Sequence, residues 1–533
     1  MTGRQGEPRR FLFVMHYPGY LRYFDTVVRM LVARGHHVDV AFDNPDKQAD
    51  GTEAIADLGS AVEDLGRMPV RGDVWAIVAR AVRGTMDYMR YLHPDFADTP
   101  YLRNRMRNAV PPLFGFLRGR ETADATTVRR ANAALAVCEQ AIPSSRVLES
   151  FIAARRPDAV LVTPLVTDRS PQVDVVKSAQ ALGVPVALCV ASWDHLTTKG
   201  LIRVRPDLIS VWNGEQKREA LAYHDVAADR IVVTGAQPFD RWFERRPTDR
   251  EAFCRKVGLP PGRPFVLFVG STASISGPDA EQRFVRRWID ALRAEPALGG
   301  IGVLVRPHPF NAAHWGAADV GNLPGVAVYP QAANPVNESD RQDYFDSLYH
   351  SEAVVGINTT AMIEAAIVGR TVHTVLADEF RDTQGGTLHF RYLLSENGGF
   401  LRVASSLPEH AAQLAETLAA PEIGREACSR FVRTFVRPAG LDAPCTPVLV
   451  GALEHLAGRR RGRARAPIVL LPLRLLLWLA GILSYYPGRA WGLVRKQKRI
   501  TEKKVHHVRK RVRRAAAARR SPKAGHEERR KAG

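Results

Sequence analysis

The sequence predicts an α/β protein of two doubly wound, Rossmann-like domains with parallel sheets, followed by a basic tail. From residue 10 to about 456, short apolar runs alternate with segments of helical pattern, which is typical of successive βα units. The alternation is interrupted between residues 73 and 155 and resumes as a second set near residue 262. From Arg459 onward the composition becomes strongly basic.

The first domain, residues 10–240, opens with a β-α-β pattern. A strand is expected at 11–15, a helix at 21–33 with Gly35 as its C-cap, and a strand at 37–42. Further strands are expected within 158–165, 184–192, 207–213 and 230–235. Residues 73–155 have no strand pattern and are rich in aromatic residues and arginine, so they predict a helical insertion.

The second domain, residues 262–456, repeats this pattern after a join near residues 237–261. Its expected strands are 265–270, 301–307, 326–330, 352–357 and 371–376. In open parallel sheets, ligands bind at the carboxyl ends of the strands. The residues that follow each strand are therefore the candidates for a functional site.

Charge and cysteine content narrow the class of protein. Of the 533 residues, those from 459 on hold 24 Lys and Arg against 3 Asp and Glu, whereas the preceding 458 hold 51 against 52. The body is thus about neutral, and a nucleic-acid partner is not expected. The five cysteines are scattered without a C-x-x-C motif, which indicates reduced cytosolic thiols rather than disulfides or a zinc ribbon.

Three polar clusters follow strands of the second domain: "GSTASIS" (270–276), "RPHP" (306–309) and "NTT" (358–360). A helix start with threonines suits a phosphate, although Asn and Thr are equally good capping residues. The Arg and His of "RPHP" suit anionic oxygens, but a histidine after a strand is often structural. The "GSTASIS" loop lacks the lysine of a P-loop and the G-x-G-x-x-G spacing of a dinucleotide site.

Four segments, "RMLVARGHHVDV", "RIVVTGAQPFDRW", "RPHP" and "GINTTAMIEAAIVGR", occur in the order found in glycosyltransferases of the GT-B fold. The chain resembles in particular the bacterial enzymes that build capsule, teichoic-acid or related envelope polymers, over residues 10–456 apart from 73–155. The resemblance implies a nucleotide donor on the second domain, with Glu364 near the ribose unless it is only an exposed helical carboxylate. The donor or phosphate candidates are Ser271, Thr272, Arg306, His308, Asn358, Thr359, Thr360 and Glu364.

On the first domain, the resemblance implies the acceptor site and its base. His16, after the first strand, and Asp194, after a central strand, are the rival catalytic bases. Tyr17, Trp193 and Lys199 are the acceptor-side candidates, with a sugar stacked on the Trp193 indole. The alternative is that Asp194 caps a turn and Trp193 is core. Because the chain has no D-x-D or H-E-x-x-H motif, we expect a metal-independent reaction with no cofactor other than the nucleotide-activated donor.

The tail, residues 459–533, contains the apolar stretch "APIVLLPLRLLLWLAGILSYY" (466–486), which is long enough to cross a bilayer. Pro472 and Arg474 interrupt it and basic clusters flank both ends, so a segment lying in the cytoplasmic leaflet is favoured over a span. The following basic residues would bind anionic lipid. A solvated disordered tail or an RNA-binding tail are the alternatives.

These observations favour a glycosyltransferase at the cytoplasmic face of the cell membrane, peripheral or monotopic, acting on an envelope glycan or a lipid-linked acceptor. A CDP-polyol phosphotransferase and a nucleotide-sugar 2-epimerase are alternatives on the same fold. A membrane-bound binding protein with a degenerate site is the non-enzymatic alternative. The donor base and sugar, the acceptor and the stereochemistry stay open.

Overall fold

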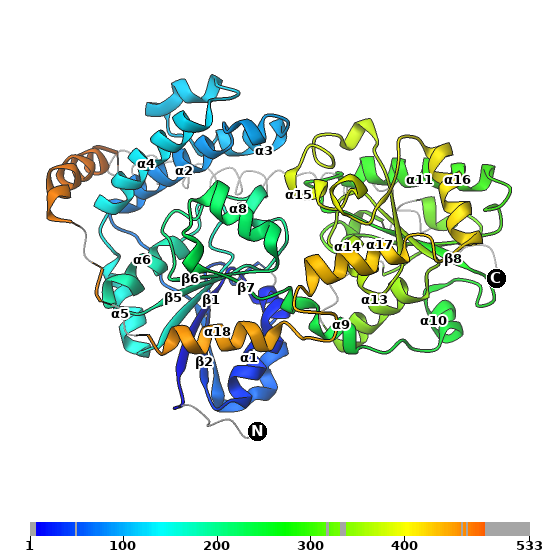
Figure 1. Ribbon diagram of the computed structural model, residues 1–533, viewed down its shortest axis with the longest axis horizontal. Helices are drawn as coiled ribbons and strands as arrows, with labels where there is room; N and C mark the ends of the chain where they lie inside the picture. Colours follow the sequence, from blue (N-terminus) through cyan, green and yellow to red (C-terminus); the bar gives the residue numbers. More distant parts are fainter. Residues whose placement is uncertain are drawn as a thin grey trace, which may run out of the picture.

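Two parallel β-sheets, each covered by helices, form the two halves of the molecule (Figure 1). The computed structural model describes residues 7–47, 51–315, 319–330, 337–459, 462–464 and 467–484. The first half carries a seven-stranded sheet of order β3-β2-β1-β4-β5-β6-β7, and the second a six-stranded sheet of order β10-β9-β8-β11-β12-β13. The order reverses between β1 and β4 and between β8 and β11, which is where a doubly wound sheet opens a crevice for ligands.

The first sheet forms where the sequence is most apolar. Its strands are β1 (Arg10–Met15), β2 (His37–Phe42), β3 (Val62–Arg67), β4 (Ala159–Thr163), β5 (Val186–Cys189), β6 (Leu208–Val211) and β7 (Ile231–Val233). The helices α1 (Leu21–Ala33), α6 (Gln172–Leu182) and α8 (Gly214–His224) connect them. Gly35 has φ +87°, which fits its predicted place after α1. The edge strand β3, "VEDLGR", was not predicted, because it is polar and half exposed.

The second sheet contains β8 (Phe265–Val269), β9 (Gly302–Arg306), β10 (Val326–Val328), β11 (Ala353–Gly356), β12 (Thr371–Val375) and β13 (Arg402–Ala404). Its helices include α10 (Arg250–Val257), α11 (Pro278–Ala294), α13 (Glu338–His350), α14 (Ala361–Ile367), α16 (Leu407–Ala419) and α17 (Arg425–Phe431). The edge strand β13 was also not predicted. It begins with Arg402 and only Ala404 is buried, so it does not stand out as an apolar run.

The helices of residues 73–155 stand above the first sheet. They are α2 (Trp75–Arg90), α3 (Pro100–Arg107), α4 (Ala125–Ala141) and α5 (Arg146–Arg155), of which α5 packs along α6 as part of the sheet's helical layer. Buried Arg83 on α2 donates to Glu139 on α4 at 2.9 Å and to Asp174 on α6 at 2.9 Å. This ion network fastens the insertion to the sheet domain.

The helix α18 (Thr446–Ala457) returns to the first domain, where Figure 1 shows it beside α1 and β2. Its Leu449, Val450 and Leu453 are fully buried in the core cluster that includes Phe11. The predicted second domain, 262–456, therefore extends one helix too far. The apolar face of α18 covers the first sheet, and a sequence pattern cannot say which sheet a helix covers.

The apolar stretch of the tail forms a turn at Ile468–Leu470 and a helix over 471–484, drawn in orange beside the insertion (Figure 1). Within the part of the chain that the structure describes, no helix has the length and hydropathy needed to span a bilayer. The remaining predicted tail, including residues 485–533, lies outside the described residues.

Candidate active site

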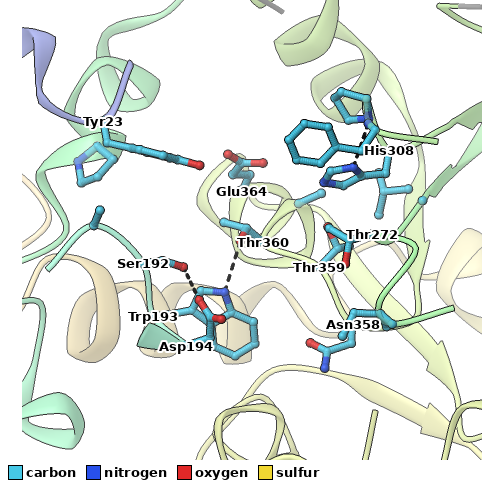
Figure 2. A pocket seen from close by; sticks show the side chains of 18 of the residues that line it. Tyr23, Ser192, Trp193, Asp194, Thr272, His308, Asn358, Thr359, Thr360 and Glu364 are labelled. Carbon is cyan, nitrogen blue, oxygen red and sulfur yellow. Dashed lines mark hydrogen bonds between the residues drawn. The ribbon is translucent and has the colours of Figure 1, made fainter. Parts of the chain in front are cut away.

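A cavity of about 500 Å³ lies between the two domains, at the carboxyl ends of β1, β5, β8, β9 and β11 (Figure 2). The first domain contributes Tyr17, Arg22, Tyr23, Asp194 and Lys199, and the second contributes Thr272, His308, Thr359, Thr360 and Glu364. Gly270 allows the loops after β8 and β9 to meet, because a Cβ there would lie 2.7 Å from the backbone nitrogen of His308. The cavity has the position expected for a ligand site in this type of sheet.

His308 presents a neutral hydrogen-bond donor to the cavity. Its Nδ1 accepts the backbone N–H of Phe310 at 3.2 Å, so in the neutral ring the proton is on Nε2. Burial, together with the nearby charge of Arg22, lowers the pKa of His308 to about 4. The side chain is therefore uncharged at pH 7 and suits an anionic oxygen as an N–H donor.

The start of α14 leaves its threonine side chains free of capping. Thr360 is the N-cap residue but makes no side-chain capping bond, and its Oγ1 instead accepts from Trp193 Nε1 at 3.2 Å. Thr359 lines the cavity beside Thr272, as Figure 2 shows. The capping alternative is thus not realised by Thr360.

Asn358 lines the cavity, but its side chain also has a structural role. It is 5% exposed, and its Nδ2 donates to the Thr383 carbonyl at 2.8 Å. Ser271 is fully buried and does not line the cavity; its Oγ accepts the backbone N–H of Asn358 at 3.3 Å. The two side chains join the β8 and β11 loops. Asn358 nevertheless lines the cavity, so its donor contact stays a prediction, whereas Ser271 does not reach the cavity and its predicted contact with a phosphate is wrong. Only Thr272 of the predicted pair reaches the cavity.

Arg306 also differs from its prediction. Its Nη1 donates to Ser347 Oγ at 2.6 Å, and its guanidinium lies 5.6 Å from the ring centre of Tyr329 and 5.2 Å from that of Tyr344. Burial lowers its pKa to about 10. The side chain, 7% exposed at the cavity wall, is held by α13 and two aromatic rings, and it supplies positive charge to the wall behind His308.

Glu364, one turn into α14, is not the exposed helical carboxylate of the alternative interpretation. Figure 2 shows its carboxylate in the cavity, with the Tyr23 ring pointing toward it. Tyr344 donates its hydroxyl to Oε2. Burial raises the pKa of Glu364 to about 7, although the Tyr344 bond and Arg22 act in the opposite direction. Near neutral pH this carboxyl is therefore able both to donate and to accept a hydrogen bond.

Asp194 is a firmly ionised carboxylate. It accepts from Ser192 Oγ at 2.5 Å and from Thr198 Oγ1 at 2.8 Å, and Lys199 Nζ lies 3.8 Å away. Burial alone would raise its pKa, but Lys199, His195 and further donors outweigh burial and hold the pKa well below its usual range. A carboxylate with so low a pKa is a weak base, so the predicted role as general base is not supported.

Trp193 does not offer a stacking face. It is 2% exposed, its ring packs edge-on to His389 with centroids 4.6 Å apart, and its Nε1 is bonded to Thr360. The predicted sugar stacking is therefore wrong, and the core alternative holds. Tyr17 does line the cavity, with Lys47 Nζ 4.7 Å above its ring.

His16 is not among the residues that line the cavity. Its Nδ1 lies 2.5 Å from Asp43 Oδ1 at the end of β2, and its ring packs against Tyr17. The structure thus fixes His16 at the carboxyl end of the central strand β1, while Tyr17 and other residues that follow it reach the site. The predicted catalytic role of His16 is not supported.

Several cavity residues were missed by sequence reasoning. Arg22 lies over the Tyr23 ring, 4.6 Å from its centre, and is the first-domain cation that acts on both His308 and Glu364. Tyr101 and Arg105 reach the cavity from α3 of the insertion. Arg22 lies in the first turn of α1, directly after the loop that follows β1, so its position in the sequence could have indicated that it faces the cleft. Nothing local indicates that α3 folds over the cleft.

No group of three or more His, Cys, Asp or Glu side chains in the described ranges is arranged to hold a metal ion. The expected independence from metals and cofactors stays a prediction.

No family model matches the chain, and no curated protein sequence matches it. The chain is similar to the solved S. aureus MnaA–UDP co-structure, with 12% identity, a TM-score of 0.50, and coverage of 84% of this chain and 96% of that one. It is also similar to UDP-GlcNAc 2-epimerase from Neisseria meningitidis bound to UDP-GlcNAc (10%, TM-score 0.49, 84% and 100%). A further match is WaaG, a glycosyltransferase involved in lipopolysaccharide biosynthesis (14%, TM-score 0.45, 84% and 100%). At such identity the similarity concerns the fold, and the chain has the GT-B fold.

Proposed function

From the GT-B fold as premise, we propose that the chain is a glycosyltransferase that binds a nucleoside diphosphate sugar in the interdomain cavity. The observation that carries this proposal is the grouping of His308 Nε2–H with the Thr359 hydroxyl and the Glu364 carboxyl on one wall. A diphosphate needs donors at its oxygens, and a ribose needs a carboxyl that bonds its hydroxyls. Both are present on the second domain.

The reaction needs stabilisation of the leaving nucleoside diphosphate. His308 and Thr359 would donate to its oxygens, and Arg22 with Arg306 would supply positive charge in a partly desolvated cavity. Glu364 accepts from Tyr344 at Oε2, which leaves Oε1 for a ribose hydroxyl. No step in this scheme requires a metal ion.

The acceptor would enter beside the first domain. Asp194 and Lys199 form a fixed ion pair at 3.8 Å, which suits the positioning of a sugar hydroxyl better than proton removal. Arg105 and Tyr101 of the insertion complete this side. We propose a membrane-proximal acceptor, an envelope glycan or a lipid-linked sugar, because the insertion also carries the apolar helix of the tail.

The first experiment is a thermal-shift panel of UDP, GDP, CDP, CMP and dTDP with and without EDTA. Ligand that binds the folded state raises the melting temperature, so the preferred nucleotide identifies the donor base. Release of that diphosphate from the corresponding nucleotide sugar, only when an acceptor extract is present, supports transfer. Release of CMP from a CDP-polyol would instead identify a phosphotransferase. If none of the five nucleotides raises the melting temperature, the proposal is contradicted.

A 2-epimerase is the second candidate, favoured by one observation. Glu364, with a pKa of about 7, lies in the donor wall and is therefore able to exchange a proton near a bound sugar without an acceptor. Incubation of the protein with UDP-GlcNAc in deuterated water distinguishes a 2-epimerase from a glycosyltransferase. Only an epimerase would convert the sugar and incorporate deuterium with no acceptor present. A protein that binds nucleotides but shows neither reaction would be the non-enzymatic binding protein.

A further inference from the structure

The helix over residues 471–484 is held to the insertion along one face. Leu477 packs against the apolar cluster that contains Trp75 and Val78 of α2. Gly481 is buried where a Cβ would lie 2.9 Å from Val78 Cγ2. Arg474 Nε donates to the Ala141 carbonyl at the end of α4, at 3.0 Å. The inner face is therefore part of the folded body.

The opposite face is apolar and uncovered. Its exposed side chains and their exposed fractions are Leu471 52%, Leu475 56%, Leu476 64%, Trp478 40%, Leu479 45% and Leu483 76%, and the preceding turn adds Ile468 82% and Val469 81%. Within the described ranges, these residues are in none of the apolar core clusters. A contiguous exposed apolar face of this kind marks a contact with another apolar phase. We call these eight residues the outer face.

The sequence on both sides of the outer face is basic. Residues 459–465 contain five arginines, and residues 485–533 contain 18 Lys and Arg against 3 Glu. An apolar face between two cationic segments complements a bilayer with anionic headgroups. RNA would satisfy the charge but would leave the apolar side chains in water, so the bilayer is the partner that fits both features.

We propose that the outer face docks on an anionic lipid bilayer with the helix lying in the plane of the membrane. Because Leu477, Gly481 and Arg474 bind the insertion, only the outer face is free to enter lipid. The insertion that carries this helix also places Tyr101 and Arg105 in the cavity. Docking therefore places the insertion at the membrane surface, and the approach of a membrane-held acceptor to the cavity along the insertion is a consequence that rests on the proposed transferase function.

Flotation of the full-length protein with phosphatidylcholine vesicles, with and without phosphatidylglycerol, tests the docking. The double variant L475E/L479E places charges one turn apart on the outer face without touching the inner one. We expect its affinity for anionic vesicles to fall roughly tenfold or more, since each apolar side chain would have to be replaced in lipid by a charge. The matched control L221E/L376E changes two exposed leucines elsewhere and should bind as the wild type does.

The orientation is tested with brominated lipids. A helix in the membrane plane predicts that shallow bromines quench Trp478 fluorescence more than deep bromines, and that W478F abolishes this difference. Stronger quenching by deep bromines would overturn the in-plane arrangement.

Other outcomes also decide the proposal. Equal vesicle affinity of L475E/L479E and wild type, or no effect of phosphatidylglycerol, would overturn it, as would binding to RNA without binding to vesicles. UDP-induced thermal stabilisation without vesicles reports on the nucleotide site alone. Vesicle binding by a protein that no nucleotide stabilises would thus leave docking intact while contradicting the transferase proposal.

Discussion

The indole Nε1 of Trp193 donates a hydrogen bond to Thr360 Oγ1 across 3.2 Å. The two residues are 167 positions apart in the chain, and their bond joins the two domains. The bond occupies the hydroxyl at the start of α14 and buries the indole against His389. It therefore couples the arrangement of the domains to the shape of the donor wall.

This bond predicts energetic coupling between W193F and T360V. Each single variant removes the bond, so we expect the double variant to be less destabilised than the sum by about 1 kcal/mol, the usual net contribution of one hydrogen bond. Urea unfolding of the four proteins measures this coupling. Strict additivity would show that the bond contributes nothing between the domains.

Because His308 is a neutral donor in the cavity, we expect its replacement to lower nucleotide affinity by the same factor at every pH above 6. H308A removes the Nε2–H donor, and we expect the Kd for the preferred nucleoside diphosphate to rise roughly tenfold, about 1.4 kcal/mol. H308Q, which retains an N–H donor, should recover part of the affinity. Because burial lowers the pKa of His308 to about 4, the effect should be the same at pH 6 and pH 8.

Isothermal titration measures these affinities, with H314A as the control. His314 is an exposed histidine on the short helix α12 (Ala312–Trp315) and does not line the cavity. A larger loss at pH 6 than at pH 8 would mean that His308 acts as a cation rather than as a neutral Nε2–H donor.

Because the pKa of Glu364 is raised, we expect the difference in unfolding free energy between the wild type and E364Q to change with pH. Its pKa is raised from 4.5 to about 7 in the folded protein, so the stability that it contributes is present below pH 4.5 and is lost as the pH rises through 7. E364Q has no such titration. Relative to E364Q, the wild type should lose about 2 kcal/mol between pH 4.5 and pH 8, allowing for its partial exposure.

Denaturation at several pH values without nucleotide measures this difference. E396Q, at an exposed position of the same domain, is the control. Parallel stability curves for wild type and E364Q would contradict the raised pKa.

Replacement of Asp240, which lies away from the proposed donor wall, is expected to lower the free energy of unfolding. Its carboxylate, on α9 (Asp240–Glu244), accepts from Cys445 N at 2.9 Å, from Thr446 N at 2.7 Å and from Arg437 Nη2 at 3.0 Å. These bonds hold the chain where it crosses back to the first domain. D240N would place an amide N–H against these donors, and we expect a loss of about 3 kcal/mol in unfolding free energy.

Urea unfolding of D240N measures the loss, and D229N, at an exposed aspartate of the first domain, is the matched control. Equal unfolding midpoints for D240N and D229N would show that the crossing is held by apolar packing of α18 alone.

Local pattern was enough for much of the fold and part of the site. Eleven of the strands lie within or beside the predicted apolar runs, because a buried parallel strand must be apolar on both faces. The edge strands β3 and β13 were not predicted, because both contain charged residues and are only partly buried. His308, Thr359 and Glu364 were found because polar residues that follow buried strands, or start the next helix, gather at one edge of a parallel sheet.

What the sequence by itself determined, then, is the alternation of strand and helix and the set of loops that face the cleft, since both depend on neighbours within a few residues. Only the tertiary structure decided which side chains in those loops are free. Arg306 is held by Ser347, Trp193 by Thr360, and His16 by Asp43, and each partner lies 27 or more residues away. The tertiary structure also decided which domain α18 covers and that α3 reaches the cavity. Burial and pairing depend on contacts between distant segments of the chain, and the local hydrophobic pattern of a sequence contains no information about such contacts.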